Sequence, residues 1–340
     1  MAAFPFFPRR SLLHPVTSRY RRLATTKKWW SRLNFSRVIR WSLYLLAAWW
    51  VYYNWHRDLP VEQLTQRYTL PGSRFLDVDG MTVHYRVTGQ GEPILLLHDA
   101  NSSLQTWAEW TTVLSGKYQV ISVDLPGFGL TGPHPRGSYS AFMYANFLEQ
   151  FVNQLHLNTF DLVGNGLGAQ VAWFYASEYP DRLHKLVLLD APGFEPKNSN
   201  MINLLARTPV LNRTIWHITP KSFIRLMLQD IYADDALVTD SLVQRHFELL
   251  LRPGNRKAFT DRAAVSDNRP PVDIIEKITT PTLILWGAED TRLSPEYAYE
   301  FHRRIHGALL RIYQNTGHWP QEENPLQTAQ DVQAFLEEKF

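Results

Sequence analysis

The chain has 340 residues, of which 45% are hydrophobic and 20% are charged, and its formal net charge is +3. This composition fits a folded protein with one large domain and additional segments. The absence of cysteine excludes disulfides, thiol catalysis and cysteine-ligated metals.

Charge is unevenly distributed along the chain. Residues 1–57 contain eleven Lys or Arg and no carboxylate, whereas residues 58–340 contain 24 Lys or Arg against 32 Asp or Glu. A basic surface for nucleic acid would therefore have to lie in the tail, where no nucleic-acid motif is present. We expect no nucleic-acid partner.

The first expected element is a transmembrane anchor over residues 38–57, after a basic tail over residues 1–37. Residues 41–55 read WSLYLLAAWWVYYNW and carry no charge. Val38 and Ile39 extend this run toward the ~20 residues that a bilayer span needs. Its aromatic end suits the membrane interface. The pattern therefore predicts that an N-terminal helix attaches the chain to a membrane.

The basic tail also predicts the orientation of this anchor. Ten Lys or Arg precede the uncharged run, so the positive-inside rule keeps the N-terminus in the cytoplasm and the folded domain outside. In a bacterial inner membrane the domain would face the periplasm. Three other interpretations stay open: a mitochondrial transit peptide, a helix on the membrane surface, and a cleaved signal peptide, which lacks an A-x-A site here.

After a linker over residues 58–72, strand and helix patterns alternate along the chain. The turn signal Asp79-Gly80 predicts a hairpin of two strands. The expected strands are 75–78, 81–87, 94–97, 118–123, 160–163, 186–189, 282–286 and 309–313, and the expected helices are 104–114, 141–155, 167–177, 295–305 and 327–338. This alternation predicts an α/β fold with a mostly parallel central sheet and helices on both faces.

Residues 194–273 interrupt the alternation. They contain apolar residues at helical spacing, breaks at Pro209, Pro220 and Pro253, and no strand pattern. An insertion between two strands would form a helical lid over the carboxyl edge of the sheet, where open α/β sheets bind ligands. The core would then consist of residues 73–193 and 274–340.

Four motifs in this core occur in a specific order. They are Leu-Leu-Leu-His at 95–98, Asp-Leu-Pro-Gly-Phe-Gly at 124–129, Gly-Asn-Gly-Leu-Gly at 164–168, and Trp-Gly-Ala-Glu-Asp at 286–290 followed by Gly-His-Trp at 317–319. Each motif alone is weak. Together, over about residues 74–340, they resemble the α/β-hydrolase fold family, in which the order is nucleophile turn, acid, histidine.

The resemblance assigns roles to several residues. His318 would be the general base and Asp290 the carboxylate that orients it, with Glu289 and Asp190 as weaker candidates for the acid. The family's nucleophilic serine would fall at Gly166, which has no hydroxyl, so the acyl-enzyme route is lost there. Glycine tolerates the strained backbone at the tip of this turn.

A second departure from the family pattern lies at Asp99. The family usually has His-Gly after the strand that leads into the oxyanion loop, and this chain has His98-Asp99. A carboxylate there opposes a developing oxyanion, although Ala100 and Leu167 still offer backbone N–H groups as the oxyanion hole. Asp99 or His318 would activate a water held at the empty turn, or would abstract a proton from carbon. The simpler role for Asp99 is to cap its own loop or the helix that begins near Ser103.

Three functions remain open from the sequence. The first is a hydrolase-lineage enzyme for small ester or acyl compounds that acts without a serine, through His318, Asp290 and Asp99. The second is a non-catalytic, membrane-tethered protein that binds a lipophilic ligand or a partner. The third is an inactivated variant of an ordinary serine esterase. In each case the expected ligand is a small apolar or acyl-type molecule, and we expect neither a cofactor nor a metal.

Overall fold

The computed structural model describes residues 35–194, 208, 213, 216–265 and 270–338. The chain divides into two compact units, residues 1–54 and 55–340. Most of the basic tail, and residues 195–207 of the predicted lid, lie outside the described residues.

The described part of the first unit is dominated by helix α2 (Phe35–Tyr53). None of the side chains in α2 is buried, and the helix contains no acidic residue. Trp49 and Tyr53, one helical turn apart, stack with ring centroids 5.7 Å apart. Across the described residues, no helix combines the length and the apolar character needed to cross a membrane.

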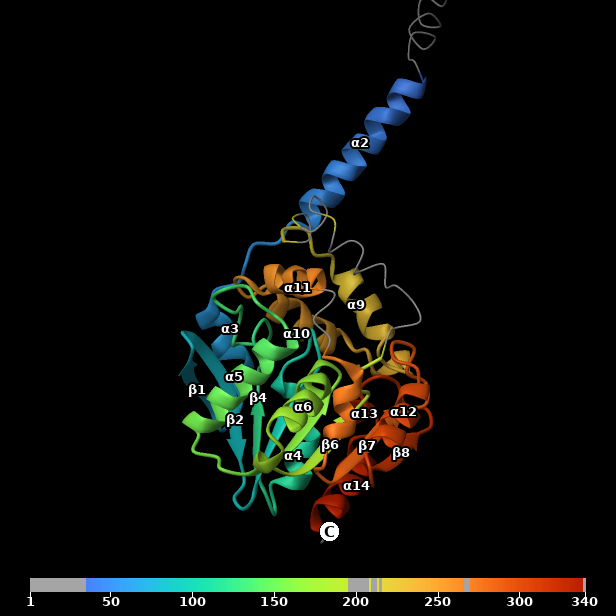
Figure 1. Ribbon diagram of the computed structural model, residues 1–340. Coiled ribbons are helices and arrows are strands. Elements are labelled where there is room, and N and C mark those ends of the chain that lie inside the picture. Colours follow the sequence, from blue (N-terminus) through green and yellow to red (C-terminus); the bar gives the residue numbers. More distant parts are fainter. Residues whose placement is uncertain (1–34, 195–207, 209–212, 214–215, 266–269, 339–340) are drawn as a thin grey trace, which may run out of the picture. The chain divides into compact units, whose positions relative to one another are not determined.

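The second unit is built on one eight-stranded sheet with the order β1-β2-β4-β3-β5-β6-β7-β8 (Figure 1). Strands β1 and β2 pair antiparallel, as do β2 and β4, and the remaining neighbours pair in parallel. The mostly parallel sheet predicted from the sequence is therefore confirmed. The strands are β1 (Ser73–Val78), β2 (Met81–Thr88), β3 (Pro93–Leu97), β4 (Gln119–Val123), β5 (Phe160–Asn165), β6 (Leu183–Leu189), β7 (Thr282–Gly287) and β8 (Leu309–Tyr313).

Side chains alternate between the two faces of the sheet along the central strands, so a hydrophobic core forms on each face. In β3, Leu95 and Leu97 face a core shared with α5 (Ala141–Gln154), α6 (Leu167–Glu178) and α12 (Glu296–Arg304). Ile94 and Leu96 face the opposite core, shared with α4 (Ala108–Leu114) and α14 (Pro325–Glu337). Successive strand residues point to opposite faces, so a continuous apolar run such as 94–97 requires helices on both sides of the sheet. The other short helices are η1 (Leu104–Trp107), η2 (Pro180–Arg182), η3 (Asp235–Leu237), η4 (Val272–Lys277) and α13 (Pro320–Glu323).

Part of the expected linker is a packed helix, α3 (Val61–Tyr68). Its Leu64 is fully buried and forms a small cluster with Leu130 and Leu249. Arg67 pairs with Glu248, which is buried. In the sequence, this segment is marked only by the turn-forming residues Pro60, Pro71 and Gly72. The helix is held in place by contacts with residues far away in the chain.

The segment between β6 and β7 is helical where the structure describes it. It contains α9 (Lys221–Gln229), α10 (Asp240–Leu250) and α11 (Asn255–Ala264), which Figure 1 shows gathered at one end of the sheet. Its apolar side chains pack together with Trp319, which lies in the loop after β8. His246 of α10 also donates a hydrogen bond to the carbonyl oxygen of Asn101, in the loop after β3. The insertion therefore contacts loops at the carboxyl ends of the parallel strands.

Candidate functional site

The tip of the turn between β5 and α6 is Gly166, with φ 52° and ψ −117°. An L-amino acid adopts this backbone conformation only under strain. The next glycine, Gly168, lies so close to β3 that an added Cβ would be 2.1 Å from the carbonyl oxygen of Leu97. The sharp strand–turn–helix connection predicted from the glycine pattern is present, and it presents no side-chain hydroxyl at its tip.

His318 and Asp290 lie together at this turn. Asp290 follows β7 and His318 follows β8, so neighbouring parallel strands deliver both side chains to the same sheet edge. His318 Nδ1 is 2.7 Å from Asp290 Oδ2. The other Asp290 oxygen accepts the backbone N–H groups of Arg292 and Leu293 at 2.8 and 3.0 Å, which fixes the carboxylate. Asp290 is thus the carboxylate that holds the Nδ1 side of the imidazole.

Glu289, the neighbouring candidate, faces elsewhere. Its Oε2 accepts the backbone N–H of Thr316 at 2.9 Å. Its role is to fix the loop that carries the histidine.

The Nε2 side of His318 faces the carboxylate of Asp99. Asp99 follows β3, and its Oδ2 lies 3.3 Å from His318 Nε2. The same oxygen accepts the indole N–H of Trp319 at 3.2 Å. Both His318 and Asp99 are buried. The simpler role considered for Asp99, capping its own loop, is wrong for the side chain, because its oxygens bond to groups on α6 and on the loop after β8.

The predicted oxyanion hole is occupied by the same carboxylate. Leu167 donates its backbone N–H to Asp99 Oδ1 at 2.8 Å. Ala100 follows Asp99 directly and is buried, but its N–H is not among the groups that hold the carboxylate. Of the two expected donors, the structure therefore brings Leu167 to this site and engages it with an internal anion.

Burial and charge together set the protonation of this group. Burial alone would lower the pKa of His318, but Asp290 and Asp99, one at each ring nitrogen, raise that pKa to about 10. Burial would raise the pKa of Asp99, but the imidazole of His318 and the Leu167 N–H hold it far below its usual value. At neutral pH the three side chains form an anion–cation–anion chain, and an imidazolium has no lone pair with which to act as a base.

A third carboxyl group adjoins this chain. Asp190, at the end of β6, is fully buried, and burial followed by the charge of Asp290 raises its pKa well above the usual value. Its Oδ1 accepts the N–H of Gly287 at 3.1 Å, and its Oδ2 accepts no hydrogen bond from the described residues. Asp190 and Asp290 therefore have pKa values shifted in opposite directions, upward for Asp190 and downward for Asp290.

The side chains at this site are also close enough together to be considered as metal ligands. One potential ligand atom from each of Asp190, Asp290 and His318 lies within 4.8 Å of the others. All three residues were candidates for the catalytic acid and base, but no metal-ligand spacing in the sequence marks them as a cluster. Both imidazole nitrogens of His318 are already engaged by carboxylates, so a metal would have to displace one of them. The geometry fits a hydrogen-bonded chain better than a metal centre.

Two residues inside the quoted motifs, His98 and Asn165, position the site through hydrogen bonds that were not predicted from the sequence. His98 Nδ1 donates to the carbonyl oxygen of Asp99 at 2.6 Å, while its Nε2 accepts the N–H of Leu125 at 2.9 Å. Asn165 donates to the carbonyl oxygen of His318 at 3.0 Å. These bonds fix the backbone on both sides of the Asp99–His318 contact. The bonds to Leu125 and to His318 form only because strands distant in the sequence become neighbours.

Comparison with known families identifies the architecture. A sequence profile described as "Alpha/beta hydrolase family" matches residues 94–331. Among curated proteins, the chain is 28% identical over 266 residues to a 2-hydroxy-6-oxo-2,4-heptadienoate hydrolase of Pseudomonas putida, which covers 74% of this chain and 91% of that protein.

Solved structures give the same result. A meta-cleavage product hydrolase from Pseudomonas fluorescens superposes with a TM-score of 0.69 at 26% identity, covering 77% of this chain and 97% of that one. A putative lipase from Acinetobacter baumannii superposes with a TM-score of 0.69 at 25% identity, covering 83% of this chain and 97% of that one.

Proposed function

We propose that this chain, which belongs to the alpha/beta hydrolase family, has no serine-hydrolase activity at its Gly166 site, and that this site instead binds a ligand or partner. One observation carries this proposal. The carboxylate of Asp99 holds both groups that a serine mechanism needs, the His318 Nε2 face and the Leu167 N–H. We take Gly166 to stand at the family's nucleophile position.

Three physical arguments support the view that serine catalysis is blocked at this site, which we call the closed site. First, Gly166 supplies no oxygen for an acyl-enzyme. Second, burial lowers the pKa of His318, but the two carboxylates outweigh burial and raise that pKa to about 10. The ring is therefore already protonated at neutral pH. Third, an oxyanion would form beside the negative charge of Asp99 and would find the Leu167 N–H engaged.

The ligand class that we propose follows from the lineage and from the helical insertion. The relatives are named as a 2-hydroxy-6-oxo-2,4-heptadienoate hydrolase, a meta-cleavage product hydrolase and a putative lipase. The insertion has an apolar cluster that includes Ile224, Leu228 and Phe247 and that reaches Trp319 above the site. We propose that α9, α10 and α11 act as a lid for a small apolar or acyl-type molecule.

A second candidate is chemistry by Asp99 itself. Its low pKa keeps it ionised against the effect of burial, and the Leu167 N–H directs one of its oxygens while the other faces His318. An ionised carboxylate beside a histidine is able to activate a water or to attack an electrophilic carbon. In this case the chain would be a serine-independent enzyme that uses Asp99, His318 and Asp290.

We also propose that residues 38–57 attach the chain to a membrane, with the domain outside the cytoplasm. The exposed Trp, Tyr and Leu side chains of α2 and the ten Lys or Arg before residue 41 support this. Fractionation tests it: the full chain should sediment with membranes and a chain lacking residues 1–57 should not. A carbonate wash that releases the full chain would indicate a surface helix in place of a span.

The closed-site proposal is tested by rebuilding the serine site. A fluorophosphonate probe and a panel of p-nitrophenyl esters are applied to the wild type, to Gly166→Ser, and to the double variant Asp99→Gly with Gly166→Ser. We expect labelling at position 166, mapped by peptide mass spectrometry, in the double variant alone. His318→Ala in the double variant should abolish it.

Wild-type turnover gives the contrary outcome. Hydrolysis of any ester that disappears in both Asp99→Asn and His318→Ala would overturn the binding proposal and support chemistry by Asp99. Urea unfolding of the wild type and of both variants checks that the variants are still folded.

A further inference from the structure

A second His–Asp pair lies at the opposite edge region of the sheet and is continued by a serine. Ser73 opens β1, His84 lies in β2 and Asp124 follows β4, and these three strands are neighbours in the sheet. Ser73 Oγ is 2.9 Å from His84 Nε2, and His84 Nδ1 is 2.7 Å from Asp124 Oδ2. The order hydroxyl, imidazole, carboxylate is that of a nucleophilic relay.

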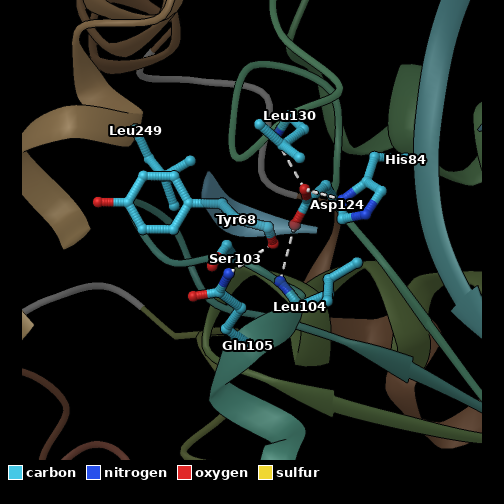
Figure 2. A pocket seen from close by; sticks show the side chains of 8 residues that line it. All are labelled: Tyr68, His84, Ser103, Leu104, Gln105, Asp124, Leu130 and Leu249. Atoms are coloured by element: carbon cyan, nitrogen blue, oxygen red, sulfur yellow. Dashed lines mark hydrogen bonds and ion pairs between the residues drawn. The ribbon is translucent and has the colours of Figure 1, made fainter. Parts of the chain in front are cut away.

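The carboxylate end of this relay is fixed and ionised. Asp124 accepts the backbone N–H groups of Leu104 at 2.7 Å and Leu130 at 2.8 Å, as Figure 2 shows. Burial would raise the pKa of Asp124, but the adjacent His84 and these donors hold it below its usual value. Asp124 accepts the Nδ1–H of His84, and in the neutral imidazole with this tautomer the Nε2 lone pair accepts the Ser73 hydroxyl proton.

The serine end is the accessible one. His84 and Asp124 are each 1% exposed, whereas Ser73 is partly exposed. The backbone N–H of Leu70 donates to Ser73 Oγ at 2.9 Å, which stabilises negative charge on that oxygen. Solvent or a substrate therefore meets a hydroxyl whose proton is directed to a buried, oriented imidazole.

The surface beside Ser73 indicates the kind of substrate. Ser73 pairs across the hairpin with Arg86, and Phe75 pairs with His84, so the four residues share one face of the two strands. Arg86 makes no ion pair with a described residue, and its Nε donates to the carbonyl oxygen of Pro71 at 3.0 Å. Phe75 is 42% exposed. A cation and an aromatic ring flank the hydroxyl.

We propose that Ser73 is a nucleophile activated by His84 and Asp124, acting on small esters that carry an anionic group for Arg86. Ser73 Oγ attacks the ester carbonyl carbon and its proton passes to His84 Nε2. The bond to the alcohol oxygen then breaks and the alcohol leaves with that proton. Water, deprotonated by the same imidazole, cleaves the acyl-serine and releases the acid. This site is separate from the one at Gly166, and neither proposal requires the other.

The test uses the full chain and a fluorophosphonate probe, followed by peptide mass spectrometry. We expect an adduct on Ser73, absent in Ser73→Ala and unchanged in Ser241→Ala, which removes an exposed serine on α10. His84→Gln should slow labelling by at least about 100-fold, the usual effect of losing a general base. Hydrolysis of p-nitrophenyl succinate should fall with Ser73→Ala, and Arg86→Gln should raise its KM while leaving the KM for neutral p-nitrophenyl butyrate unchanged.

Two results would overturn the proposal. One is the absence of any adduct on Ser73 in the folded wild type. The other is labelling of Ser73 at the same rate in wild type and in a folded His84→Gln variant. If His84→Gln does not fold, His84→Asn replaces it, and labelling of Ser73 at the wild-type rate in that variant contradicts activation. The adduct position separates this test from that of the closed site, because the wild type has no hydroxyl at residue 166.

Discussion

Gly166 and Asp99 share one volume: a Cβ placed on Gly166 would lie 2.0 Å from Asp99 Oδ1 and 2.3 Å from its carboxyl carbon. No side chain, serine included, fits at position 166 while the Asp99 carboxylate holds the Leu167 N–H. The two departures from the family pattern are therefore one structural change, because the carboxylate takes the space that the missing side chain leaves.

The first prediction concerns this shared volume. Gly166→Ala and Gly166→Ser should each lower the free energy of unfolding by about 2–4 kcal/mol, through overlap with Asp99 and through side-chain strain at a positive φ. Asp99→Gly should lower it separately by removing the partners of His318 and Leu167. The double variant should cost less than the sum of the two single changes by about 1 kcal/mol or more, measured by urea unfolding. Additive effects would show that the two side chains do not compete.

The second prediction is a loss of stability at alkaline pH. The pKa of His318 is raised to about 10 in the folded state, against about 6.5 in the unfolded chain. Its contribution to stability is therefore fully present below pH 6.5 and is lost as the pH rises toward 10. The slope is at most about 1.4 kcal/mol per pH unit for one proton.

Asp99→Asn supplies the matched control for that slope. It keeps the size of the side chain and removes one of the two charges that raise the pKa of His318. The fall in stability between pH 7 and 9.5 should therefore be smaller in Asp99→Asn than in the wild type, measured by urea unfolding at each pH. Equal slopes would mean that His318 is not held as an imidazolium by Asp99.

The third prediction concerns α3 in the predicted linker. Leu64 is fully buried against Leu130 and Leu249, so Leu64→Ala should cost about 2–4 kcal/mol. Glu62→Ala, on the exposed side of the same helix, should change stability by less than about 0.5 kcal/mol. Thermal unfolding of both variants tests whether α3 belongs to the folded core. A small effect for Leu64→Ala would restore the description of this segment as a linker.

Local patterns in the sequence predicted the sheet well. The strand expected at 94–97 lies within β3, and that at 160–163 lies within β5, because continuous apolar runs between turn signals are typical of buried parallel strands. The turn at Asp79-Gly80 also forms as expected, with positive φ at both residues. Helix α3 was missed, because Leu64 alone marks its buried face and its partners come from distant segments.

The candidate site was predictable in its members but not in its electrostatics. The order of the motifs predicted that Gly166, His318 and Asp290 lie close together, as they do in the structure. The contact between Asp99 and His318 Nε2 depends on the fold of two loops 220 residues apart in the chain, as the bond from Trp319 to the same carboxylate shows. No local pattern encodes such a distance. The relay from Ser73 through His84 was not predicted for a different reason: Ser73 lies before the strand expected at 75–78, and Asp124 comes from beyond a third strand.

The last prediction concerns Asp190, a buried carboxyl group whose pKa is raised by burial and by the adjoining Asp290. For an acid whose pKa is raised in the folded state, stability is lost as the pH rises from its unfolded value of about 4, because the unfolded chain ionises more easily. Asp190→Asn should remove this loss. Asparagine keeps an oxygen for the Gly287 N–H, offers an amide donor toward Asp290, and tolerates the positive φ of 44°. The variant should therefore be more stable than the wild type at pH 8 by about 1 kcal/mol or more, and the gain should shrink at pH 5, by urea unfolding at both values. A destabilised variant at pH 8 would show that Asp190 is ionised and needed as an anion beside His318.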